Sequence, residues 1–338
     1  MSNALSSRIV LGVSRCLLGD QVRYDGAARR DAYIVDILAP HVEFVPICPE
    51  VECGMGVPRP PVHLVGDPAQ PRMLGVADLG ADFTARMVQF SASTHARIAH
   101  LHGYILKSRS PSCGINDTPI FAADGRVHAY GAGLFTRAIT GFNANLPLQD
   151  ERALQVPEAR DQFFEQVFSY RRWHQQVARA ETLAALREFH VAYKYSVLAH
   201  HQDSYRALGQ MLAHATLSSA FSAQYAERFF AALRRPATRT SHINVLQHLL
   251  GYFKKIATVV ERHRVLELMS SYQQGMIELG RVLQELRSLN ARYPNAYLLK
   301  QNYLYPEADE MLLRVSERAC STNSDNHSGS ASADIGSL

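Results

Sequence analysis

The sequence changes part-way along its length from mixed patterning to purely helical patterning, and this change limits the fold more than any other feature. In the first part, short apolar segments typical of strands alternate with segments of helical periodicity. Strand and helix patterns alternate over the segments 8–14, 32–40, 42–48, 81–102 and 104–107. This β-α-β order predicts a Rossmann-like α/β domain with a doubly wound, mainly parallel sheet.

The second half shows apolar residues only at helical spacing. Helices are predicted over the segments 181–201, 205–216, 222–235, 242–257 and 262–293. A chain of 338 residues is long enough for two hydrophobic cores. We therefore expect an α/β domain over 1–147, an all-α domain over 148–315 and, because its composition is rich in Ser, Asn, Asp and Gly, a disordered tail over 316–338.

The patterning predicts no membrane association. No apolar run reaches the roughly 18–20 residues that a bilayer span needs. The first 20 residues lack the basic and long apolar regions of a secretory signal, so we expect a cytoplasmic protein. In that reducing compartment, five scattered cysteines argue against a disulfide framework and leave catalysis, metal binding or burial.

Three of the cysteines, Cys16, Cys48 and Cys113, fall at or just after the end of a predicted strand. The carboxyl ends of parallel strands meet at one edge of a sheet, so the three loops should converge there. Structural zinc sites usually combine two C-x2-4-C motifs, whereas the nearest cysteines here, Cys48 and Cys53, form a single C-x4-C with no second pair. Three thiolates from three loops better suit a [4Fe–4S] cluster with one open iron, and simple burial remains the alternative.

Six motifs occur in order within residues 8–145: CLLG, VRYDG, PICPE, GVPRPP, SPSCG and GAGLFT. Through them the chain resembles the bacterial thiouracil desulfidase family. The helical half resembles a domain of unknown function often fused to that family, through FHVAYKY, LGQMLA, NVLQHLLGYFKK and YLLKQNYLYP. Together the two halves look like the fused members of the family, the tRNA 4-thiouridine desulfidases.

The resemblance implies an oxygen-sensitive [4Fe–4S] enzyme with Cys16, Cys48 and Cys113 as the cluster ligands. It also implies that an open iron binds the sulfur of a thiocarbonyl, and that Glu50 and Ser110 belong to the catalytic site. We expect Cys53 to be a bystander, with a role beside or instead of Cys48 as the alternative.

The chemistry of the reaction agrees with these roles. Replacing C=S by C=O needs a water molecule aimed at carbon, and Glu50 lies near enough to Cys48 to accept its proton. Ser110 would orient the water or the pyrimidine. The alternatives are a solvated loop carboxylate for Glu50 and a turn hydroxyl for Ser110. Hydrolysis with sulfide as leaving group requires neither electrons nor ATP.

The helical half is the expected site of RNA binding, because a thionucleobase within folded tRNA must be extruded to reach a buried cluster. Residues 1–150 carry 13 basic and 13 acidic residues, whereas 151–315 carry 21 and 15. An ordinary solvated surface would also explain the surplus. The candidate phosphate contacts are Arg171, Arg172, Lys194, Arg234, Arg235, Arg239, Lys254 and Lys255, and the candidate stacking residues are Tyr193, Tyr195 and Tyr252.

Three functions follow from these patterns. The first is desulfuration of 4-thiouridine in tRNA, and the second is the same chemistry on free thiouracil or a thionucleoside. The third is a structural zinc and RNA-binding module without catalysis. The sequence does not indicate an oligomeric state.

Overall fold

Short apolar segments of the first 150 residues pair into a four-stranded, fully parallel sheet of order β2-β1-β5-β8. Its strands are β1 Ile9–Ser14, β2 Val42–Ile47, β5 Gly103–Leu106 and β8 Leu148–Asp150. The structure, a computed structural model, describes residues 8–315 and confirms the predicted α/β class. The sequence pattern does not predict β8, which lies beyond residue 147 and yet pairs with β5.

Helices cover both faces of this sheet, because alternate side chains of its strands point to opposite sides. One face packs against the helical turn Tyr33–Leu38 and against α3, Pro157–Arg172. The other packs against α1, Thr84–Ile98, and α2, Leu134–Phe142. The helix α3 begins after residue 147, so the predicted boundary separates the sheet from a helix that completes its core.

A second four-stranded sheet, of order β4-β3-β6-β7, is absent from the sequence prediction. Its strands are β3 Val62–Val65, β4 Arg72–Gly75, β6 Thr118–Phe121 and β7 Val127–Gly131. The central pair β3 and β6 is parallel, and the outer pairs are antiparallel. Because β3 follows the Cys48 loop and β6 follows the Cys113 loop, this sheet ties the two loops together.

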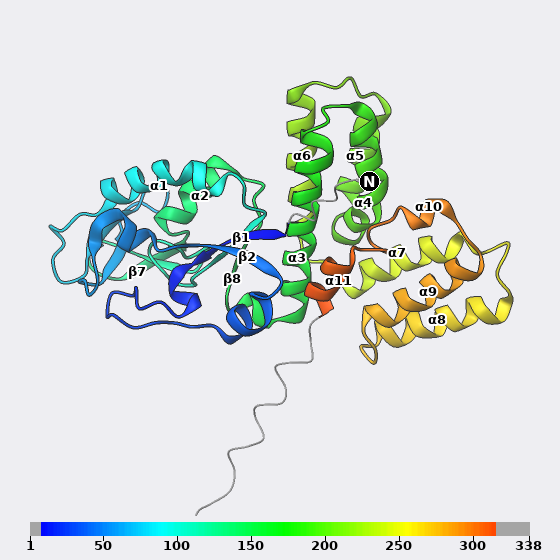
Figure 1. Cartoon of the computed structure of the whole chain (residues 1–338), viewed down its shortest axis with the longest axis horizontal. Coiled ribbons are helices and arrows are strands. Elements are labelled where there is room, and N and C mark those ends of the chain that lie inside the picture. The colour runs from blue at the N-terminus through cyan, green and yellow to red at the C-terminus, as the bar shows by residue number, and fades with distance from the viewer. Residues whose placement is uncertain (1–7, 316–338) are drawn as a thin grey trace, which may run out of the picture.

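The remaining described residues are helical, as predicted (Figure 1). The helices are α4 Leu183–His200, α5 Gln202–Ala213, α6 Ser219–Leu233, α7 Arg239–Gly251, α8 Val259–Gln273, α9 Leu279–Arg292, α10 Ala296–Leu299 and α11 Ala308–Val315. The segment 262–293, predicted as one helical stretch, contains parts of two helices, because Gly275 adopts a φ of 79° between α8 and α9. The predicted tail, 316–338, lies outside the described residues.

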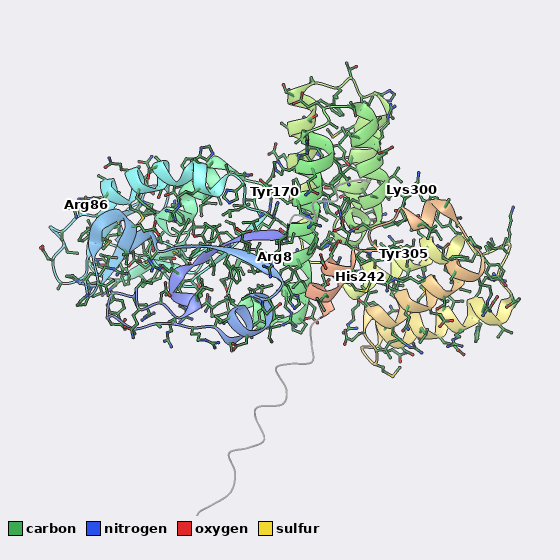
Figure 2. All side chains as sticks on the ribbon, viewed as in Figure 1. Arg8, Arg86, Tyr170, His242, Lys300 and Tyr305 are labelled. Carbon is green, nitrogen blue, oxygen red and sulfur yellow. The ribbon has the colours of Figure 1, made fainter. Side chains whose placement is uncertain are left out.

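The helices form two groups (Figure 1). One, α3 to α6, stands beside the α/β part, and Tyr170 lies where the two meet (Figure 2). The other, α7 to α10, has its own apolar core, to which α4 also contributes. Among the described residues, no helix is both long and apolar enough to cross a membrane.

Candidate metal centre

The strand register brings the first two cysteine loops together. The strands β1 and β2 are paired to their last residues, Ser14 opposite Ile47, so Cys16 and Cys48 follow neighbouring strand ends. On the other side of β1, the Lys107 amide at the end of β5 donates a hydrogen bond of 2.9 Å to the Ser14 hydroxyl. The carboxyl ends of three strands therefore share one edge, as the β-α-β pattern predicts.

The Cys48 thiol lies near enough to both Cys16 and Cys113 to influence them electrostatically. Burial raises the pKa of Cys113 to about 12, and a hydrogen bond from Ser14 only partly opposes this increase. Burial likewise raises the pKa of Cys16 to about 11. The charge of Cys48 raises both values further. A nucleophilic cysteine needs a lowered pKa, whereas a bound metal deprotonates its thiol ligands outright, so these thiols suit metal ligation.

The Cys113 loop packs against the start of α2 through backbone hydrogen bonds. The Gly133 amide donates to the Gly114 carbonyl at 2.8 Å, and the Phe135 amide donates to the Ser112 carbonyl at 3.0 Å. A Cβ atom on Gly133 would lie 2.4 Å from the Ser112 carbonyl group. Glycine is therefore required in the GAGLFT motif, because only it permits this close approach of two backbones.

The Glu50 carboxylate is fixed at both oxygens. Its Oε2 accepts hydrogen bonds from Arg59 Nε at 3.0 Å and Nη2 at 2.7 Å. Its Oε1 accepts a hydrogen bond of 2.7 Å from the Ser112 hydroxyl. The Arg59 side chain is only 4% exposed, and its Nη1 also donates to the carbonyls of Val22 and Gly56. Arg59 thus joins two of the cysteine loops and orients Glu50 toward the third.

Ser110, predicted as catalytic, reaches Glu50 only through Ser112. Its hydroxyl accepts hydrogen bonds from the backbone amides of Ser112 and Cys113 at 3.3 and 3.1 Å. It also lies 2.9 Å from the Ser112 hydroxyl. Sequence reasoning assigned no role to Arg59 or Ser112, although both occur in the motifs GVPRPP and SPSCG that carry the family resemblance.

Cys53 lies beside the same carboxylate residue. Its thiol is 3.3 Å from the Glu50 carbonyl oxygen, to which it donates. Within residues 8–315, no three His, Cys, Asp or Glu side chains are grouped to hold a single metal ion. A [4Fe–4S] cluster binds each cysteine to a separate iron, so its ligands surround a volume instead of meeting at one point. The buried thiol of Cys113 and the partly buried thiols of Cys16 and Cys48 fit such a cluster in chemistry, in number and in their origin from three loops.

A buried ion pair borders this edge at the end of the fourth strand. Lys107 Nζ donates to the Glu151 carboxylate, which also accepts hydrogen bonds from the Ser108 amide at 2.8 Å and hydroxyl at 2.7 Å. Burial opposes ionisation, but these bonds outweigh it and lower the pKa of Glu151. The Lys107 charge in turn lowers the pKa of Cys16, so it stabilises the thiolate there.

The predicted RNA contacts do not form a single cluster in the structure. Arg234, Arg235 and Arg239 lie before or at the start of α7, whereas Lys254 and Lys255 lie exposed beyond its other end. Arg239 donates to the Tyr272 carbonyl at 2.9 Å and covers its ring. The Lys194 ammonium lies over the Tyr195 and Tyr297 rings, 4.8 and 4.7 Å from their centroids.

The prediction of RNA contact is wrong for four further candidates, because their side chains are buried. Arg171 and Arg172 are each 7% exposed and form ion pairs with Glu307. Tyr193 and Tyr195 are 1% and 3% exposed and belong to two different apolar cores. The helical periodicity could not show this, because buried and exposed faces of a helix carry both aromatic and arginine residues.

Comparison with known proteins identifies the family. Residues 11–151 match the family model of 2-thiouracil desulfurase, and residues 194–307 match a domain of unknown function, DUF1722. The uncharacterized protein YbgA of Escherichia coli is 33% identical over 141 residues, which are 40% of this chain and 83% of YbgA. The chain belongs to the 2-thiouracil desulfurase family and carries the DUF1722 domain.

Two further known proteins are similar to the chain. The uncharacterized protein YbbK of Bacillus subtilis is 32% identical over 111 residues, 30% of this chain and 71% of YbbK. The solved structure of a [4Fe-4S]-dependent thiouracil desulfidase, TudS, is 28% identical, covers 45% of this chain and 95% of its own, and has a TM-score of 0.37.

Proposed function

We propose that this chain replaces the sulfur of 4-thiouridine in tRNA with oxygen and releases sulfide. The observation that carries the proposal is the Glu50 carboxylate, which Arg59 fixes on one side while Ser112 links it to the Cys113 loop. A general base held beside the Cys48 and Cys113 thiols is the arrangement that hydrolysis of a metal-bound thiocarbonyl needs. Membership in the 2-thiouracil desulfurase family supports the same chemistry.

We assign Cys16, Cys48 and Cys113 as the ligands of a [4Fe–4S] cluster, with Cys53 outside the ligand set. When bound, such a cluster supplies an iron with an open position, which attracts a soft thiocarbonyl sulfur and weakens its bond to carbon. Three protein ligands leave that position free.

Side chains of the protein then accept and transfer the protons of the water molecule. Arg59 occupies Oε2 of Glu50 with two donors, whereas Ser112 is the one donor to Oε1 among residues 8–315, so Oε1 is the oxygen that takes a proton from water. The chain from Ser110 through Ser112 to Glu50 can move that proton toward the departing sulfur. In balance, C=S and H2O give C=O and H2S, and no electron is transferred.

The choice of tRNA as substrate rests on the basic surplus of the helical half and on its exposed lysines. Lys254 and Lys255 are both exposed and follow α7, where the backbone of an RNA can approach them. The alternative substrate is free thiouracil or a thionucleoside, and the description of the matched family as 2-thiouracil desulfurase favours it. A zinc and RNA-binding module without catalysis finds no support in that match.

The test compares the substrates directly. Anaerobically reconstituted full-length protein is incubated with thiolated bulk tRNA, with 4-thiouridine and with 2-thiouracil, and released sulfide is measured. We expect the highest kcat/KM for tRNA, and Lys254→Ala/Lys255→Ala should raise the KM for tRNA alone. Glu50→Gln should keep its iron and lose turnover, whereas Glu43→Gln, an exposed carboxylate on β2, should behave as wild type. Turnover of the free base but not of tRNA would refute the tRNA assignment.

A further inference from the structure

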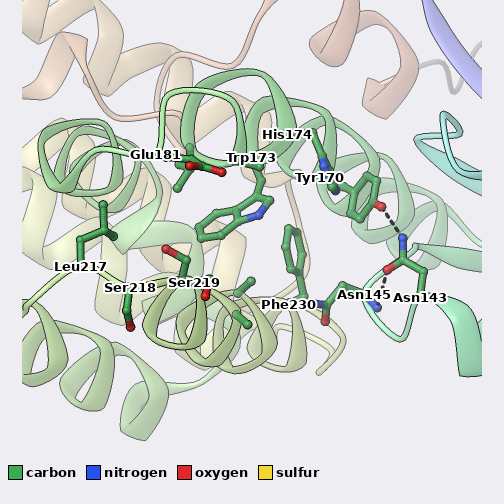
Figure 3. Close-up of a pocket in the computed structure, with 15 residues that line it drawn as sticks. Asn143, Asn145, Tyr170, Trp173, His174, Glu181, Leu217, Ser218, Ser219 and Phe230 are labelled. Carbon is green, nitrogen blue, oxygen red and sulfur yellow. Dashed lines mark hydrogen bonds between the residues drawn. The ribbon is translucent and has the colours of Figure 1, made fainter.

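A pocket of about 510 Å³ lies at the junction of the α/β part and the helices (Figure 3). The loop after α2, the helical turn Trp173–Ala178 and the first half of α6 enclose it. The helix α2 begins at the Cys113 loop and ends beside this pocket, and its 9 residues span about 13 Å. The pocket is therefore separate from the candidate metal centre.

The pocket combines aromatic walls with one amide oxygen, Asn145 Oδ1, that lacks a hydrogen-bond partner among the described residues. Tyr170, Trp173 and Phe230 line it, and Asn143 donates to the Tyr170 hydroxyl at 2.5 Å (Figure 3). The Asn145 oxygen is buried, and no donor within residues 8–315 reaches it. Buried polar atoms are almost always paired, so this acceptor lacks a donor that a molecule bound in the pocket would supply. An asparagine amide offers an acceptor and a donor side by side, as the edge of a nucleobase requires.

The charges around the pocket suit a ligand whose neutral part lies inside and whose anionic part lies at the edge. Glu181 is the only carboxylate that lines it, and no lysine or arginine of the described chain is among its lining residues. A phosphate is therefore disfavoured inside. At the edge, Arg234 is exposed and donates to the carbonyl of Ala144, between the two asparagines. A neutral base inside the pocket and a phosphate at Arg234 match the two parts of one nucleotide.

We propose that this pocket binds one unstacked nucleobase of the RNA substrate, with Asn145 on its edge and Arg234 on its phosphate. The inference deepens the proposed function, since it rests on RNA being the substrate. The helical half then has a specific role, because its pocket holds a second nucleotide of the same RNA while the thiolated base reaches the metal centre. Single-stranded RNA is commonly recognised in this way, through unstacked bases held on aromatic side chains.

Trp173 is the sole tryptophan of the chain, so its fluorescence reports occupancy of this pocket directly. Single-stranded RNA oligonucleotides, and separately each of the four ribonucleoside monophosphates, are titrated into the full-length protein. We expect saturable quenching by RNA and weaker quenching by monophosphates, because only RNA also engages other basic residues. Quenching by monophosphates but not by RNA would overturn the proposal and assign the pocket to free nucleotides.

A pocket-filling variant provides the second arm. Ala223 lies exposed on α6 at the pocket, so Ala223→Leu should fold normally and fill the space. Ala220→Leu, also exposed on α6 but outside the lining, is the matched control. A base held on aromatic rings contributes about 1–3 kcal/mol, so the variant should weaken RNA binding on the order of tenfold and abolish quenching.

The outcomes separate this inference from the proposed function. If Ala223→Leu weakens desulfuration of tRNA and leaves free thiouracil turnover unchanged, the pocket is an RNA site. If RNA binds and quenches Trp173 while no thiolated substrate loses sulfur, the pocket stands and the proposed function fails. If Ala223→Leu and wild type bind RNA equally and Trp173 is not quenched, the pocket inference is wrong even where desulfuration is intact.

Discussion

Replacing Arg59 by methionine tests whether its contact with Glu50 positions the general base. The Arg59 side chain is 4% exposed and that of Glu50 is 12% exposed, so the ion pair is buried. Methionine keeps much of the apolar volume of arginine and removes every donor. The carboxylate then loses two hydrogen bonds, and the carbonyls of Val22 and Gly56 lose one each.

The expected cost follows from this burial. Removing one partner of a buried ion pair destabilises a protein by about 3–5 kcal/mol. The matched control is Arg97→Met, because Arg97 pairs with the neighbouring Glu52 at 2.6 Å but is 46% exposed. Exposed pairs contribute about 0–1 kcal/mol. A base displaced by about 1 Å loses on the order of 100-fold in rate, so kcat for desulfuration should fall by about that factor in Arg59→Met alone.

Urea unfolding followed by circular dichroism gives the stability of both variants, and sulfide release gives kcat. Adding Glu50→Gln in each background completes a double-mutant cycle, which isolates the energy of the contact. We expect a large coupling energy with Arg59 and none with Arg97. Equal losses in Arg59→Met and Arg97→Met, or full activity in Glu50→Gln, would refute the role of Glu50 as base.

Three other predictions follow from the site and the helical half. Ser112→Ala should retain iron and lower kcat about 10- to 100-fold, because a hydrogen bond to a charged group contributes about 1.5–3 kcal/mol. An unchanged kcat would contradict the proton relay from Ser110 through Ser112 to Glu50. Gly133→Ala should lose iron on reconstitution because its Cβ would clash with the backbone of the cysteine loop, whereas Gly141→Ala, with open space around it, should keep iron and gain up to about 1 kcal/mol of stability. Burial lowers the pKa of His200, but hydrogen bonding to the buried Glu165 outweighs this and raises the pKa overall. The stabilisation from the protonated histidine should be complete below about pH 6.5 and lost as the pH rises through the raised pKa, so the Tm of wild type should fall over that range and that of His200→Gln should not.

The first sheet is predictable from sequence because its strands are apolar runs separated by periodic helices. The second sheet is not, because its strands have only four or five residues and several of them are partly exposed. The boundary after residue 147 follows the change in patterning, yet β8 and α3 complete the sheet from beyond it. A change in periodicity marks where helices begin and does not show what they pack against.

The convergence of the cysteine loops follows from the parallel strand order, which places their carboxyl ends on one edge. The partners of Glu50 cannot be found in this way. Arg59 and Ser112 come from two different loops, and they meet only because the second sheet ties those loops together. Likewise, periodicity alone could not distinguish the buried Arg172 from the exposed Lys254.

The most direct test of the central claim is the iron and sulfide content of anaerobically reconstituted protein with single cysteine substitutions. We expect about four irons and four sulfides per chain in wild type, as a [4Fe–4S] cluster requires. Cys53→Ser, the matched control, should keep this content, whereas Cys16→Ser, Cys48→Ser and Cys113→Ser should each lose it. Full content in any of those three variants, or loss of content in Cys53→Ser, would contradict the ligand assignment.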